Sequence, residues 1–370
     1  GLGDVYKRQP RFCAAKHSTR RFCCRGKTEG SFLQDKLTPR QVRAWSLCAL
    51  SVPAAMALPG CGWLWVLGGS ILACALAACQ QAMQRHSGLC MRQAFARAFG
   101  AVGGQIMAAA ELLWLLFATS GAAAASQIAF EDDLGPFLPA IPLLLAALAG
   151  QKGRLAAGRV CAVLALCLAG LYAVIAAASL RHVQADWSRP QGVPADAALA
   201  FCLCLGPACM AFVTAEEETP RISPGTAAAS ALLPAVPAFL TAACLSPELA
   251  RQEPLPFLTL TKSLSVLSVM QRFELLLSVA QLLGLFALLT MLVCAAERML
   301  GAVRRKNGTG STGGVFCLLA FGGSFLAYRL PIWSWAVGAA IFWGVVPILT
   351  QVIVLSLIHI SEPTRLLSIS

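Results

Sequence analysis

The chain of 370 residues is 58% apolar and only 12% charged, and it carries a formal net charge of +12. A soluble globular domain has roughly 25% charged residues, so this composition excludes an ordinary soluble fold. Apolar runs of spanning length recur along the whole chain, which indicates an all-α, polytopic protein of the lipid bilayer. The excess positive charge lies in short loops and in the N-terminal stretch, so we expect no nucleic-acid partner.

The two ends of the chain are related through their codons. A DNA segment that encodes Asp4–Gln9 can encode Leu355–Ile360 on its opposite strand, as expected of one sequencing adapter translated on both sides of an insert. We therefore interpret residues 1–9 and 355–370 as adapter-derived artefacts and set them aside. The basic stretch 10–35 is either a cytoplasmic arm or upstream DNA read in frame, and we favour the second.

Residues 36–354 are predicted to form one membrane domain with about ten spans. Lys and Arg are more frequent in alternate loops, which places the N-terminus in the cytoplasm and gives an even number of spans. The outer segment 246–272 is either a plain loop or carries an interfacial helix in its second half. The expected spans are 41–59, 62–83, 98–124, 137–150, 155–180, 196–214, 226–245, 273–297, 313–328 and 332–354.

Two of these spans carry a break at matching positions in two five-span halves. Pro53 lies in the first span, and Gly206 and Pro207 lie in the middle of the sixth. Proline removes a backbone N–H and clashes with the carbonyl four residues earlier, and membranes tolerate such breaks where they face protein or a cavity. Matching breaks favour a transporter-type binding site, although two simple proline kinks in packed helices would give the same pattern.

The breaks and one carboxylate supply the candidate ligand-binding residues. An opened helix offers N–H groups to a carboxylate and carbonyls to an ammonium group, so we expect a small amino-acid-like ligand. Glu111 is the one carboxylate deep in a span, where ionisable groups are costly. It could pair with a substrate ammonium, relay a proton, or be a protonated, hydrogen-bonded residue. The candidates are Ser51, Val52, Pro53, Ala54, Glu111, Cys204, Leu205, Gly206 and Pro207.

The sequence gives no sign of catalysis. It shows no nucleophile–base pair, no metal-spaced ligand set and no phosphate loop, so we expect no enzyme, no metal and no cofactor. The 16 cysteines are mostly single residues in apolar runs without a C-x-x-C motif, which favours small, reduced packing residues. None of the four histidines lies in the middle of a span, which argues against haem.

Three segments resemble one known family. They are "LTPRQVRAWSLCALSVPAAMALPG" at the first span, "GQKGRLAAGRV" before the fifth, and "PLPFLTLTKSLSVLSVMQRFELLLSVAQLLG" before and into the eighth. In order and spacing they are similar to the spore germination permeases, the B subunits of nutrient germinant receptors in endospore-forming bacteria. The resemblance implies the amino acid–polyamine–organocation superfamily fold, with ten spans in two inverted repeats. It also implies partner A and C subunits and the inner membrane of the spore.

Three functions follow as hypotheses. The leading one is a germinant-receptor subunit that binds an amino-acid-like germinant at mid-membrane, between the first and sixth spans, and triggers germination. The alternative is an amino-acid transporter coupled to protons or sodium. A less favoured alternative is a membrane anchor subunit of a redox complex. Binding without flux would favour the receptor, and net uptake would favour the transporter.

Overall fold

The computed structural model describes residues 37–357, except 88, 90, 135–136, 188, 190–191, 214–223, 265–272, 304–311, 330–337, 339–340 and 355. The interpretation of 1–9 and 10–35 therefore lies outside the described residues. So does that of 355–370, apart from Ser356 and Leu357. All three stay proposals.

The first half of the domain consists of five helices joined by short connections. Helix α1 begins at a capping box, in which the Thr38 hydroxyl accepts from the Gln41 N–H at 3.3 Å and the Gln41 side chain accepts from the Thr38 N–H at 2.9 Å. The helices are α1 (Pro39–Met56), α2 (Trp63–Ser87), α3 (Met91–Leu134), α4 (Ala140–Lys152) and α5 (Arg154–Ser179), followed by the single turn η1 (Leu180–His182).

The second half repeats this order with two short helices added. Its elements are α6 (Pro194–Val213), α7 (Pro224–Leu245), α8 (Pro247–Gln252), α9 (Pro256–Ser263), α10 (Phe273–Val303), α11 (Thr312–Tyr328) and two π-helical stretches, η2 (Ile341–Val345) and η3 (Ile348–Ile353). Each of the ten expected spans thus contains a helical segment within the described residues. In 246–272 the helices α8 and α9 lie in the first part, and 265–272 lies outside the described residues.

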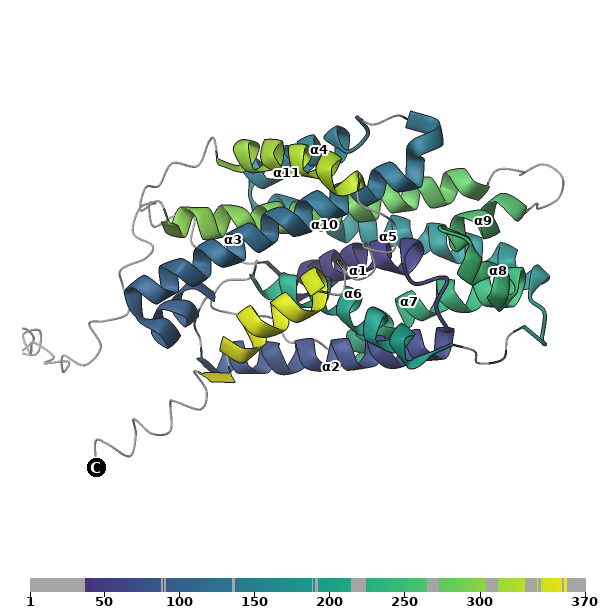
Figure 1. Ribbon diagram of the computed structural model, residues 1–370, viewed down its shortest axis with the longest axis horizontal. Helices are drawn as coiled ribbons and strands as arrows, with labels where there is room; N and C mark the ends of the chain where they lie inside the picture. The colour runs from purple at the N-terminus through teal and green to yellow at the C-terminus, as the bar shows by residue number, and fades with distance from the viewer. Residues whose placement is uncertain are drawn as a thin grey trace, which may run out of the picture. The chain divides into compact units, whose positions relative to one another are not determined.

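The long helices pack in two groups (Figure 1). Helices α1, α2, α6 and α7 contact one another, with α2 packed most extensively on α6, while α3, α4, α10 and α11 form the other group. Equivalent helices of the two halves make equivalent contacts: α2 packs on α6 as α7 packs on α1, and α3 packs on α11 as α10 packs on α4. Likewise α5 packs on α1 as η2 packs on α6. This correspondence is the packing signature of two five-helix repeats.

The outer surface of the helices suits a lipid environment. Five helices among the described residues are long and apolar enough to cross a membrane, and four shorter apolar helices accompany them. Large aliphatic side chains lie on the outside, for example Leu166 at 76% and Leu326 at 73% exposure. Water would penalise such a surface heavily, so the chain is an integral membrane protein.

Helix α3 contains a sharp bend that fixes where its long part begins. Gly100 has φ +77°, a backbone conformation that glycine adopts at little cost. The preceding segment folds back so closely that a Cβ on Gly104 would lie 2.7 Å from the Ala96 Cα. The expected third span, 98–124, therefore lies almost entirely in the part of α3 that follows the bend, and the helix continues beyond it to Leu134.

The expectation of interrupted helices at the first and sixth spans needs a correction. Helix α1 continues through Pro53 to Met56, and α6 continues through Gly206 and Pro207 to Val213. Each proline removes one helical hydrogen bond, but close packing on all sides holds the turns in place. In α1 the helix ends three residues later, and the Pro53 carbonyl accepts from both the Ala57 and Leu58 N–H groups at 3.1 Å.

Candidate functional site

The candidate residues of α1 are buried between α5 and α10. The Ser51 hydroxyl donates to the Cys48 carbonyl at 2.6 Å, and the Ser51 carbonyl accepts from the Tyr172 hydroxyl at 3.2 Å. Gly284 of α10 lies directly against the Ser51 hydroxyl, where a Cβ would overlap it. Val52, Pro53 and Ala54 are also buried. This end of α1 is therefore tightly enclosed.

The candidate residues of α6 face α2 and the C-terminal segment. Cys204 Sγ lies 3.6 Å from the Ser70 hydroxyl of α2, and Leu205 is fully buried. Gly206 packs against the Trp343 ring, and a Cβ there would overlap the ring and lie 3.0 Å from the Trp343 carbonyl. Pro207 is buried in the next position. The absence of a side chain at Gly206 is thus what allows η2 to approach α6.

The structure brings the two sets of candidates onto neighbouring helices. Helices α1 and α6 are in contact, and Leu50 and Leu58 of α1 share one apolar cluster with Cys204 and Leu205 of α6. Proline at 53 cannot donate to the carbonyl of Ala49, and proline at 207 cannot donate to that of Leu203. Both helices therefore carry a backbone carbonyl without its helical donor at corresponding points.

Glu111 lies in a separate buried polar chain. The Gln351 side-chain amide donates to Glu111 Oε1 at 2.9 Å, and the Gln80 amide donates to Gln351 Oε1 at 3.1 Å. All three side chains are at most 1% exposed. Sequence reasoning missed Gln80 and Gln351, although intramembrane amides are costly enough to be a signal. The pairing itself joins residues 271 apart in sequence, which the sequence alone does not reveal.

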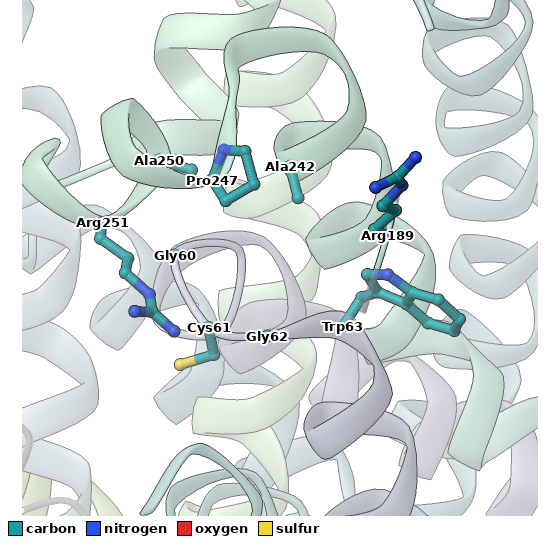
Figure 2. A pocket seen from close by; sticks show the side chains of 9 residues that line it. All are labelled: Gly60, Cys61, Gly62, Trp63, Arg189, Ala242, Pro247, Ala250 and Arg251. Atoms are coloured by element: carbon teal, nitrogen blue, oxygen red, sulfur yellow. The ribbon is translucent and has the colours of Figure 1, made fainter. Parts of the chain in front are cut away.

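A small hollow lies where the turn between α1 and α2 faces α8 (Figure 2). It is lined by Gly60–Trp63, Ala242, Pro247 and Ala250, with Arg251 on one side and Arg189 on the other. Burial raises the pKa of the Cys61 thiol to about 12, and the nearby charge of Asp196 adds to the shift. Cys61 is therefore a neutral thiol at physiological pH.

Asp196, near the start of α6, ties this region together. Its Oδ2 accepts from the Gly62 N–H at 2.8 Å and from the Val193 N–H at 3.2 Å, and the Arg251 guanidinium lies 3.7 Å away. The bond to Val193 caps the first turn of α6, where a negative charge is favourable. One carboxylate thus connects α6, the α1–α2 turn and α8.

Replacing Asp196 with alanine is expected to destabilise the protein by about 2 kcal/mol, because it removes a helix cap and a charge-assisted hydrogen bond. The measurement is thermal unfolding of the purified protein in detergent. Asp186→Ala is the matched control, since Asp186 is exposed and its ion pair with Arg189 spans 3.9 Å. The control should change stability by less than about 0.5 kcal/mol; equal effects of the two variants would contradict the assigned role of Asp196.

The arrangement described so far is a polytopic helical membrane fold built of two related five-helix halves. No protein-family model and no curated protein matches the chain. Among solved structures it is similar to Mhp1, a nucleobase-cation-symport-1 family transporter in a closed conformation with bromovinylhydantoin bound, with 14% identity, a TM-score of 0.55, and 82% of this chain and 75% of that chain covered. It is also similar to a Na⁺-coupled sialic acid symporter in a substrate-bound, outward-open state, with 13% identity, a TM-score of 0.52, and 86% and 76% covered.

Similarity at this level of identity concerns the fold. The expected all-α architecture of two inverted five-helix repeats is confirmed, and the similar structures are transporters rather than enzymes. The resemblance to the spore germination permeases finds no counterpart among these matches. The chain is therefore an integral membrane protein with this fold, while the ligand site and the specific function are proposals.

Proposed function

We propose that the chain is a secondary transporter that moves a small amino-acid-like solute across the membrane, coupled to a proton or sodium gradient. The observation that carries the proposal is the pairing of α1 and α6, each with an internal proline at a corresponding position of two packed repeats. The fold is also similar to that of two cation-coupled symporters. Those proteins take a hydantoin and sialic acid, so the fold serves polar organic solutes.

The proposed ligand site consists of the candidate residues of α1 and α6, with Pro53 and Pro207 at its centre. The carbonyls of Ala49 and Leu203 lack their helical donors and are suited to an ammonium group, because a buried acceptor gains most from a charged donor. Since both helices are continuous and enclosed, a ligand would enter after α1 or α6 moves away from its neighbours. Such alternation is the usual mode of repeat-based transporters.

The receptor hypothesis rests on the sequence resemblance alone, and it brings with it the A and C subunits and the spore inner membrane. It shares the ligand site with the transporter proposal and differs in whether the solute crosses. The cytoplasmic N-terminus rests on loop charge in both cases. A redox anchor would show haem absorption in the purified protein.

The test is uptake by the full chain reconstituted in liposomes, with a pool of tritiated L-amino acids as probe. Accumulation driven by an imposed proton or sodium gradient supports the transporter. Saturable binding to the purified protein without flux would support the receptor and contradict transport. Neither binding nor flux for any member of the pool would overturn the amino-acid-like site itself.

A further inference from the structure

The chain of Gln80, Gln351 and Glu111 is unusual for its position. It joins α2, η3 and α3 inside a membrane protein, and its members are almost completely buried. Polar side chains at such depth are expensive unless they are fully hydrogen-bonded. Here two acceptors have no partner among the described residues, namely Glu111 Oε2 and Gln80 Oε1. This group of three side chains therefore has fewer hydrogen-bond donors than acceptors.

The surroundings of Glu111 supply no cation in the described part of the chain. The titratable group that acts electrostatically with it is the Cys209 thiol of α6. Thr350 is uncharged; its hydroxyl donates to the Val346 carbonyl at 3.0 Å and also interacts with the Glu111 carboxyl group. Helices α10 and α11 also pack on α3, but their thiols Cys294 and Cys317 interact with Glu297 instead. A bound proton would neutralise Glu111, so that Oε2 would no longer be a buried carboxylate oxygen without a donor.

The partner of Glu111 lies on a segment that also contacts the candidate ligand site. In η2, Trp343 packs against Gly206, and Gly344 packs against Cys202 of α6. The Trp114 indole of α3 donates to the Phe342 carbonyl at 2.5 Å. Both stretches of this segment are π-helical, a rare geometry that occurs often at functional sites. One short segment thus links the carboxylate on α3 to the candidate site on α6.

We propose that Glu111 is a proton-binding site whose occupancy controls how tightly the segment 341–353 is held against α3. The proton adds to Glu111 Oε2, and no other bond forms or breaks. The hydrogen bond from Gln351 then ends on a neutral acid instead of a carboxylate, which makes it roughly half as strong. The weakened contact frees the segment that covers Gly206. The inference rests on the proposed function, because it names the proton as the coupling ion of that transporter.

The first experiment needs no solute. Tryptophan fluorescence of the purified full chain is followed from acid to alkaline pH, since Trp114 and Trp343 report on the segment. Wild type should show a reversible transition that is absent in Glu111→Gln. Glu297→Gln is the matched control and should keep the transition. Glu297 is a half-buried carboxylate of α10 that does not belong to the hydrogen-bonded group of Gln80, Gln351 and Glu111. Gln351→Leu retains Glu111 and should move the midpoint, which separates loss of the proton site from misfolding.

The second experiment uses the same variants in liposomes with the tritiated L-amino acid pool. Glu111→Gln should reduce accumulation driven by a pH gradient by about tenfold or more, the factor corresponding to loss of one charge-assisted hydrogen bond. Exchange of labelled for unlabelled solute without a gradient should persist.

The outcomes distinguish the two proposals. A pH transition unchanged in Glu111→Gln, or equal pH-driven uptake by wild type and Glu111→Gln, overturns the proton site and leaves the transporter standing. A transition that depends on Glu111 in a protein that moves no solute upholds proton binding and contradicts transport.

Discussion

Replacing Gly206 with leucine is expected to abolish solute accumulation while leaving membrane insertion intact. The new side chain would overlap the Trp343 ring. Its Cβ alone would lie 3.0 Å from the Trp343 carbonyl oxygen. A ring can rotate away, but a backbone carbonyl moves only if η2 moves, so the segment would be displaced from α6. Overpacking of this kind costs about 1–3 kcal/mol. The measurement is gradient-driven uptake, normalised to the amount of monodisperse protein in the liposomes.

Gly170→Leu is the matched control for this variant. Gly170 lies on the exposed face of α5, and nothing lies within 4 Å of the position its Cβ would take. Lipid accommodates a leucine there, so uptake should match that of wild type. Normal uptake by Gly206→Leu would remove the α6 half of the proposed ligand site. Loss of uptake in both variants would point to a general effect of added bulk.

The second large effect is expected at the contact between α1 and α10. A Cβ on Gly284 would overlap the Ser51 hydroxyl and lie 3.2 Å from the Cys48 carbonyl. Gly284→Ala should therefore destabilise the protein by about 1–3 kcal/mol through overpacking. Ser51→Ala removes the hydroxyl that the new methyl group meets, so the double variant should regain part of the loss. The measurement is thermal unfolding of the single and double variants in detergent.

The double-mutant cycle measures the interaction energy between positions 284 and 51, and this energy can contradict the prediction. Residues in direct contact show interaction energies of about 0.5–3 kcal/mol, whereas independent sites add. Strict additivity of Gly284→Ala and Ser51→Ala would mean that the two residues do not touch. Gly322→Ala on the open face of α11 serves as control, and it should be neutral or stabilising by up to about 1 kcal/mol, because alanine favours the helix.

Much of the fold follows from local sequence signals. The expected spans 155–180 and 226–245 differ by at most two residues from α5 and α7, because long apolar runs bounded by charge or proline leave little choice of limits. The start of α1 is predictable from Thr38, Pro39 and Gln41, because Thr38 and Gln41 form a capping box and Pro39 lies in the first helical turn.

Other features depend on contacts that a single sequence does not reveal. Pro53 and Pro207 predict interrupted helices, but packing on Gly284 and Trp343 holds both helices continuous. A proline in the sequence indicates that one helical hydrogen bond is lost. Whether the helix unwinds there depends on how the neighbouring helices pack against it. Glu111 stood out as a lone intramembrane carboxylate, whereas its partner Gln351 depends on the meeting of α3 with a distant segment.

The most direct measurement is uptake of tritiated L-amino acids against an imposed ion gradient, with wild type and Gly206→Leu reconstituted in parallel. Wild type should accumulate at least one amino acid above equilibrium, and Gly206→Leu should not. Equal accumulation by the two proteins would contradict the ligand site between α1 and α6. Saturable binding by wild type with no accumulation would contradict transport and leave a receptor built on a transporter fold.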